Sequence, residues 1–270
     1  MPRMISSQEL IRLVGAEKCP LIVDVRRDTV FAEAPTRIAA SLWRDHTKVD
    51  QWLPLLPGGR RIVVYCAHGH NVSEIALAKL RAAGADAQML EGGIDAWEEA
   101  GGPVLARTAP GLDPATQRSS EWVTRTRPKV DRIACPWLIR RFIDPLAVVH
   151  FVAAEWVRDV ADEIGAIPFD IVGVDYSHRA DECTFDTLLS EFRLTDPALL
   201  HLARIVRGAD TARLDLEPQA AGLLALSLGL SAVEDDDHAQ LEKGMIVYDG
   251  LYGWCRHARD ETHNWPARAA

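Results

Sequence analysis

A short run of apolar and aromatic residues ends at a cysteine in the first part of the chain. The run is Ile62-Val63-Val64-Tyr65, and it leads into the segment 66–72 and then into a stretch with helical periodicity. Continuous apolar runs of this length are typical of strands that are buried in a sheet. The pattern predicts a strand, a loop and a helix, with Cys66 at the carboxyl end of the strand.

Helical periodicity dominates the second half of the chain. Pro136 suits the first turn of a helix whose apolar positions between 137 and 143 would form its buried side. Further helices are predicted over 185–192 and 199–206. The stretch 218–230 is almost entirely apolar and ends in glycine, which predicts that this helix is the core of its domain.

Residues 107–120 separate these two parts. They are rich in Pro, Gly, Ser and Thr and show no hydrophobic periodicity, as is typical of a linker. A chain of 270 residues with 48% hydrophobic and 26% charged residues is long enough for two globular domains. We predict a first domain over 1–106, a linker over 107–120, a second domain over 121–260 and a tail over 261–270.

Composition excludes several classes of protein. There is no apolar span of membrane length and no long apolar leader at the N-terminus, so we expect a cytoplasmic protein without membrane contact. A net charge of −9 disfavours a general nucleic-acid-binding surface. The five cysteines are widely spaced, which argues against a disulfide scaffold or a zinc ribbon. The sequence does not define an oligomeric state.

The position of Cys66 makes it a candidate nucleophile. Loop N–H groups and the positive end of the following helix would stabilise an anion there, either a thiolate or a persulfide. Gly69 would let the loop close tightly, although an ordinary turn also explains it. His68 and His70 would tune the thiolate or transfer protons, or they are solvated loop residues. The alternative for Cys66 is a small buried core residue.

Three motifs in the first domain resemble the rhodanese family. They are Asp24-Val25-Arg26, the unit around Cys66, and the turn and helix that start at Glu91-Gly92-Gly93, and the likeness covers residues 5–106. The resemblance implies an α/β fold with a central parallel sheet. It also implies a persulfide on Cys66, a sulfur donor and a thiol acceptor as partners, and no required cofactor.

The loop departs from this family at two positions. Arginines that bind anionic donors commonly follow the loop glycine, whereas this chain has His70 and Asn71. A neutral imidazole carries less positive charge, so affinity for a small dianion such as thiosulfate should fall. A protein persulfide or another thiol therefore stays open as the donor.

Basic residues gather at the start of the second domain, with six Arg or Lys residues between positions 125 and 141. Guanidinium groups form bidentate hydrogen bonds to oxyanions, which makes Arg125, Arg127 and Arg132, together with His178, a candidate oxyanion site. The alternative is a solvated basic face.

A weaker possibility is a metal site at His178, Asp181 and Cys183, whose side chains are close in sequence and of metal-binding types. No established metal motif matches them. The alternative is that Cys183 is buried and that His178 makes a single hydrogen bond.

The segment 129–142 resembles the ChrB-type chromate-resistance family. Further similar stretches are 169–171, 177–179, 183–186, 205–210 and 248–252. The resemblance implies a link to chromate and a helix-rich α+β second domain, but it implies no reaction. Some members carry an N-terminal region thought to bind DNA; a rhodanese-like domain stands in its place here, which disfavours direct DNA binding.

Two hypotheses follow for the whole chain. The first is a sulfurtransferase that uses a Cys66 persulfide and is coupled to chromate resistance or response through the second domain. The alternative is a non-catalytic protein that senses chromate, another oxyanion or a metal.

Overall fold

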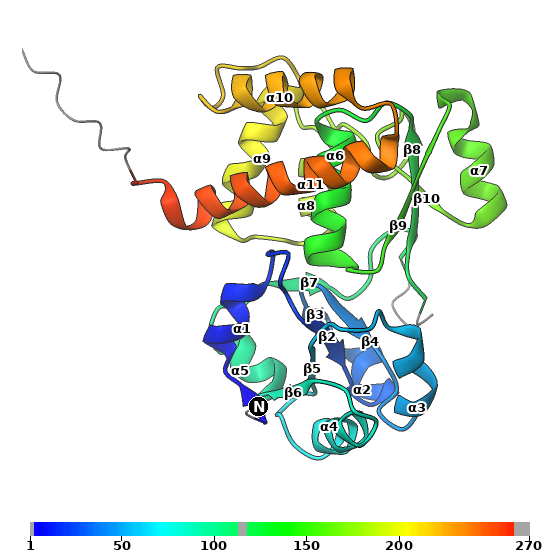
Figure 1. The fold of residues 1–270 in the computed structure, drawn as a ribbon, viewed down its shortest axis with the longest axis vertical. Helices are drawn as coiled ribbons and strands as arrows, with labels where there is room; N and C mark the ends of the chain where they lie inside the picture. Colours follow the sequence, from blue (N-terminus) through cyan, green and yellow to red (C-terminus); the bar gives the residue numbers. More distant parts are fainter. Residues whose placement is uncertain (1–2, 113–117, 262–270) are drawn as a thin grey trace, which may run out of the picture.

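Five parallel strands form the central sheet of the first domain (Figure 1). In order across the sheet they are β1 (Met4–Ile5), β6 (Ala87–Leu90), β5 (Ile62–Tyr65), β2 (Leu21–Asp24) and β4 (Ser41–Trp43). An antiparallel pair joins β3 (Thr36–Ile38) to β7 (Val104–Ala106). The structure is a computed structural model that describes residues 3–112 and 118–261. It confirms the expected α/β fold with a central parallel sheet.

Helices lie on both faces of this sheet. They are α1 (Ser7–Leu13), α2 (Asp28–Glu33), α3 (Val49–Trp52), α4 (Val72–Ala82) and α5 (Gly93–Glu99), with a 3-10 turn η1 (Leu53–Leu55) after α3. Successive side chains of a strand point to opposite faces. Val63 and Tyr65 of β5 accordingly pack with Trp97 of α5. Ile62 and Val64 belong to a second cluster with residues of α3 and α4.

The second domain is rich in helices, as expected, and contains a small parallel sheet (Figure 1). The sheet has the order β10 (Ile167–Pro168), β8 (Glu121–Arg125), β9 (Val148–Val152). The α-helices are α6 (Asp131–Leu138), α7 (Val157–Ile164), α8 (Thr184–Phe192), α9 (Pro197–Asp210), α10 (Ala220–Val233) and α11 (Asp237–Gly253). Shorter helical segments are η3 (Ile139–Ile143), η4 (Ala154–Trp156) and η5 (Trp254–Ala258).

Two sequence-based expectations about these helices were wrong. Pro136 lies inside α6 rather than in its first turn, because the helix already begins at Asp131. The apolar stretch at 218–230 is not the core of its domain. Helix α10 contributes only a narrow stripe to the interior, and Leu226, Leu228 and Val233 are exposed by 55%, 47% and 78%.

A continuous hydrophobic cluster extends from the first domain into the second. The end of α1 lies at this contact. Gly15, which follows α1, approaches Phe142 and Tyr252 so closely that a Cβ atom would lie 2.5 Å from Phe142 Cζ and 2.6 Å from Tyr252 Cε1. Arg256 of η5 donates a hydrogen bond of 3.0 Å to the carbonyl oxygen of Val14. The two domains therefore share buried surface and polar contacts.

Strand β7 ends at Ala106 and β8 begins at Glu121. The domain boundaries at 106 and 121 stay a prediction. Residues 113–117 of the expected linker and 262–270 of the expected tail lie outside the described residues. Within the described part of the chain, no helix combines the length and the apolar character needed to cross a membrane.

The contact at Gly15 gives a stability prediction with an internal control. Gly15 and Gly84 have φ angles of +83° and +82°, but only Gly15 is enclosed by side chains. Gly84→Ala should lower the free energy of unfolding by about 1 kcal/mol through backbone strain. Gly15→Ala should lower the free energy of unfolding by about 1–3 kcal/mol more than Gly84→Ala does, because the new methyl group overpacks the contact. Urea unfolding followed by tryptophan fluorescence measures both, and equal losses would contradict the described domain contact.

Candidate functional site

Cys66 lies at the carboxyl end of β5, and the loop 66–71 connects it to α4. The side chain is buried, and its Sγ donates a hydrogen bond of 3.2 Å to the carbonyl oxygen of His70. Beside it is a cavity of about 290 Å³ that is lined by Cys66, His68, His70, Asn71 and Arg27, among others. The structure therefore brings four of the predicted site residues to one cavity.

The start of α5 holds this loop in place. Its N–H groups at Ile94 and Asp95 donate to the carbonyl oxygens of Cys66 and Ala67, over 2.9 and 3.2 Å. Gly69 has a φ of +71°, and a Cβ atom there would lie 2.8 Å from the nitrogen of Gly92. The close approach of two backbones explains why a glycine is needed at position 69. Gly69 positions the loop and does not line the cavity.

The loop offers donors for an anion. Within residues 3–112 and 118–261, the backbone N–H groups of residues 67–71 donate to no protein acceptor. His68 is exposed, and its Nδ1 lies 2.6 Å from Asp95 Oδ2. Free N–H groups that follow one another in a loop form a concave anion-binding surface. The loop therefore presents backbone donors that no described protein group occupies.

A buried ion pair lies next to the loop, at the end of β2. Asp24 is fully buried and accepts hydrogen bonds from Arg26 and from the hydroxyl of Tyr65, the last at 2.8 Å. Arg26 also donates to the carbonyl oxygen of Thr36 at 3.0 Å. The pair therefore ties the end of β2 to the end of β5 and to β3.

Arg27 was not predicted as a site residue. It follows the end of β2, which is the neighbour of β5 in the sheet, and it lines the Cys66 cavity. The carboxyl ends of neighbouring parallel strands meet at one edge of a sheet. Knowing that β2 pairs with β5 would have placed Arg27 near the Cys66 loop. Its guanidinium supplies a permanent positive charge that the loop residues lack.

The predicted oxyanion cluster has a carboxylate at its centre. Asp170 Oδ2 lies 2.9 Å from a guanidinium nitrogen of Arg125 and 3.3 Å from one of Arg132. Arg127 is directed elsewhere, with its guanidinium donating to the carbonyl oxygen of Ser231 at 2.9 Å. An oxyanion at this place would have to displace Asp170, so an oxyanion site here stays a prediction.

His178 lies among carboxylates that were not predicted. Its Nε2 is 3.4 Å from Asp131 Oδ2, 3.6 Å from Asp170 Oδ1 and 3.1 Å from Asp210 Oδ2. Asp181 and Cys183, the expected companions of His178, do not belong to this group. Asp181 is exposed, and burial raises the pKa of Cys183 well above its ordinary value.

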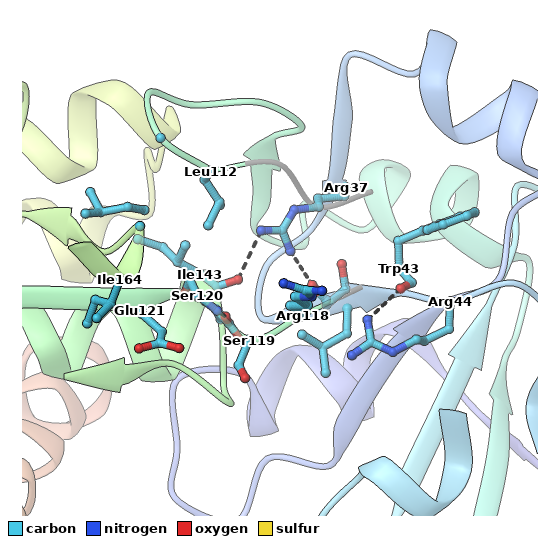
Figure 2. A pocket seen from close by; sticks show the side chains of 16 residues that line it. Arg37, Trp43, Arg44, Leu112, Arg118, Ser119, Ser120, Glu121, Ile143 and Ile164 are labelled. Atoms are coloured by element: carbon cyan, nitrogen blue, oxygen red, sulfur yellow. Dashed lines mark hydrogen bonds between the residues drawn. The ribbon is translucent and has the colours of Figure 1, made fainter. Parts of the chain in front are cut away.

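A second cavity, of about 250 Å³, lies where the first domain meets the start of the second (Figure 2). Figure 2 shows the side chains of Arg37, Arg44 and Arg118 gathered around it. Arg37 and Arg44 are only 2% and 5% exposed, and burial lowers the pKa of both. Asp144 and Glu121 are the carboxylates of the lining, and Asp144 already accepts hydrogen bonds from Ser120.

The hydrogen bonds that Arg37 and Arg44 donate in this interdomain cavity go to carbonyl oxygens. Arg37 donates to Ser41 and, over 3.1 Å, to Ile143, while its Nε has no partner among the described residues. Arg44 donates to the carbonyl oxygen of Trp43 at 2.7 Å. Burial lowers the pKa of both arginines by more than the charge of Asp144 in the same lining raises it. A further anion in the cavity would gain charge-assisted hydrogen bonds from the two guanidinium groups.

Comparison with known families assigns both parts of the chain. Residues 6–100 match the rhodanese-like domain, and residues 122–255 match the ChrB C-terminal domain. Protein ChrB of Cupriavidus metallidurans (strain ATCC 43123 / DSM 2839 / NBRC 102507 / CH34) is 36% identical over 149 residues, which are 55% of this chain and 44% of that protein. This chain thus matches less than half the length of that relative.

Two solved structures match part of the chain in sequence. A rhodanese-related protein from Thermoplasma volcanium is 29% identical over 38% of this chain and 97% of its own, with a TM-score of 0.33. A rhodanese-like domain protein from Staphylococcus aureus is 28% identical over 36% of this chain and 91% of its own, with a TM-score of 0.32.

Cys66 lines a cavity, whereas the other four cysteines are buried thiols with raised pKa values. Burial raises the pKa of Cys19 to about 12 and that of Cys255 to about 11, and it raises the pKa values of Cys135 and Cys183 well above the ordinary value. Only a thiolate reacts with iodoacetamide, so these thiols should react slowly at neutral pH. We expect Cys66 to be alkylated first in the native protein, as measured by peptide mass spectrometry.

The same reaction in guanidinium chloride is the control, because unfolding should bring all five thiols to similar rates. Labelling of Cys135 or Cys183 as fast as Cys66 in the native protein would show that Cys66 is not the accessible thiol.

Proposed function

Because this chain joins a rhodanese-like domain to a ChrB C-terminal domain, we propose that it is a sulfurtransferase that carries a persulfide on Cys66 and acts in chromate resistance or response. The observation that carries the proposal is the position of Cys66, which borders a cavity at the end of β5 beside loop N–H groups without protein acceptors. We place the protein in the cytoplasm, because all five of its cysteines are free.

The proposed reaction moves one sulfur atom in two displacements. The Cys66 thiolate attacks the outer sulfur of a donor that holds a sulfane sulfur. The sulfur–sulfur bond of the donor breaks, the donor leaves with the electron pair as a thiolate or sulfite, and a new sulfur–sulfur bond forms on Cys66. An acceptor thiolate then attacks the outer sulfur and regenerates the Cys66 thiolate. The N–H groups of residues 67–71 stabilise the anionic sulfur in each step.

The charges around the cavity bear on the choice of donor. His70 and Asn71 supply no permanent positive charge, whereas Arg27 places a guanidinium at the edge of the cavity. Hydrogen bonds from a guanidinium to an oxyanion are charge-assisted and strong. Arg27 would therefore contribute more to binding of thiosulfate than to binding of a low-molecular-weight persulfide.

Intact-mass analysis tests the persulfide directly. After incubation with thiosulfate or a low-molecular-weight persulfide, the wild-type protein should gain the mass of one sulfur atom, because Cys66 forms a persulfide. Cys66→Ser should show no gain, and Cys255→Ser should behave as the wild type. A gain that persists in Cys66→Ser, or none in the wild type with either donor, would contradict the proposal.

Arg27→Gln tests the choice of donor in the same assay. Loading from thiosulfate should slow by about 10-fold, as expected for loss of a charge-assisted hydrogen bond. Loading from the persulfide should change little. Arg12→Gln removes an exposed arginine of α1, outside the cavity lining, and serves as the control for net charge.

A second candidate function is the binding of a tetrahedral oxyanion such as chromate. We place this site in the interdomain cavity rather than at Arg125 and Arg132. Arg37 and Arg44 donate to carbonyl oxygens and form no ion pair with a carboxylate of residues 3–112 or 118–261, whereas Arg125 and Arg132 both contact Asp170. Its lining comes from both domains, so a bound oxyanion would stabilise their contact. This arrangement supports the sensing hypothesis without requiring any reaction.

Sulfate is a suitable probe of this site because it has the shape and charge of chromate without its oxidising power. Arg44→Gln should weaken sulfate binding by at least about 10-fold, since Arg44 would lose a charge-assisted hydrogen bond to the anion. Isothermal titration calorimetry at low ionic strength measures the effect, with Arg12→Gln as the control. Equal affinity of the wild type and Arg44→Gln would exclude this cavity as the oxyanion site.

A further inference from the structure

Four side chains from four separate segments converge in the second domain. Asp131 is the first residue of α6, Asp170 follows β10, His178 precedes α8, and Asp210 ends α9. The carboxylate oxygens of these aspartates lie 3.1–3.6 Å from Nε2 of His178. These four residues, which we call the His178 cluster, belong to segments through which the chain resembles the ChrB-type family.

The carboxylate of Asp131 has one oxygen without a partner. Asp131 is fully buried, and its Oδ2 accepts a hydrogen bond of 2.6 Å from the backbone N–H of Thr184. Its Oδ1 is enclosed and accepts no hydrogen bond from any described residue. A buried carboxylate oxygen in this state is costly unless a ligand satisfies it. The oxygen without a partner belongs to the same carboxylate whose Oδ2 lies 3.4 Å from the imidazole of His178.

The charges in the cluster favour a cation as that ligand. Asp170 turns Oδ2 toward Arg125 and Arg132, while its Oδ1 lies on the side of His178 and accepts a hydrogen bond of 3.2 Å from Thr184 Oγ1. Three carboxylates therefore face a single imidazole, and a divalent cation between them would offset their negative charge.

We propose that Asp131, Asp170 and His178 bind one divalent metal ion, because one ligand atom from each lies within 4.8 Å of the other two. Asp210 contacts Nε2 of His178 but lies outside this group. A metal with bonds of about 2.1 Å in octahedral geometry places neighbouring donor atoms about 3 Å apart. The separations of 3.4 and 3.6 Å from His178 Nε2 to Asp131 Oδ2 and Asp170 Oδ1 are close to that spacing. Carboxylate oxygens suit Mg²⁺, Ca²⁺ and Mn²⁺, and an imidazole nitrogen favours a transition metal. Mn²⁺ is the divalent ion that best combines these preferences.

The surroundings of the cluster provide both rigidity and access. Val130 holds a φ of +39° next to Asp131, an unfavourable conformation for a β-branched residue, and it is fixed by hydrogen bonds from Tyr248 and to Ser227. His178 is 41% exposed, so an ion can reach the cluster from solvent on its side. The site would thus load without unfolding of the domain, and its role is independent of the chemistry at Cys66.

Titration of the full chain with Mn²⁺ tests the proposal. The protein is first stripped with EDTA and dialysed, and free Mn²⁺ is then followed by electron paramagnetic resonance. The wild type should bind one equivalent. His178→Ala and Asp170→Asn should each weaken binding by at least about 10-fold, as loss of a ligand does. Asp181→Asn, which removes a nearby exposed carboxylate outside the cluster, should bind as the wild type does.

Asp170→Asn keeps the shape of the side chain, and circular dichroism of each stripped variant checks that it is folded. Absence of Mn²⁺ binding in the wild type, or equal binding by the wild type and both ligand variants, would overturn the proposal. In that case the cluster would be an ion pair between a protonated His178 and its carboxylates.

Discussion

The buried pair of Asp24 and Arg26 is the contact on which the first domain's functional edge depends. Asp24 receives hydrogen bonds from Arg26 and Tyr65, so the ends of β2 and β5 are fixed relative to each other. Arg26 also donates a hydrogen bond to the carbonyl oxygen of Thr36. Arg37, which follows Thr36, donates one to the carbonyl oxygen of Ile143 in the second domain. Removing one partner of such a pair leaves a buried charge uncompensated. The same chain of contacts thus supports the cysteine loop and the domain interface.

Much of the first domain could be predicted from the sequence, because its signals are local. An apolar run followed by Cys66 and a helical pattern defines a strand, loop and helix without reference to the rest of the chain. Arg27 escaped the prediction because its place depends on which strand is adjacent to β5. Strand order is a property of the whole sheet, and a list of predicted strands does not contain it.

The second domain was harder to predict for the same physical reason. His178 was grouped with Asp181 and Cys183 because they are close in sequence, whereas its real neighbours come from α6, α9 and the segment after β10. The apolar composition of α10 suggested a core helix, but only contacts made in three dimensions decide which of its sides is buried. The composition of α10 predicted a helix, but it did not predict which residues of that helix are buried.

The hydrophobic cluster that crosses both domains has a consequence for the history of the chain. Two domains connected only by a linker can be exchanged by recombination without loss of stability. Here a substitution at Gly15, Phe142 or Tyr252 in one domain changes the fit of the other, because these residues are in direct contact. The two halves must therefore evolve together, and transplanting either one into another protein would leave an apolar surface exposed to water.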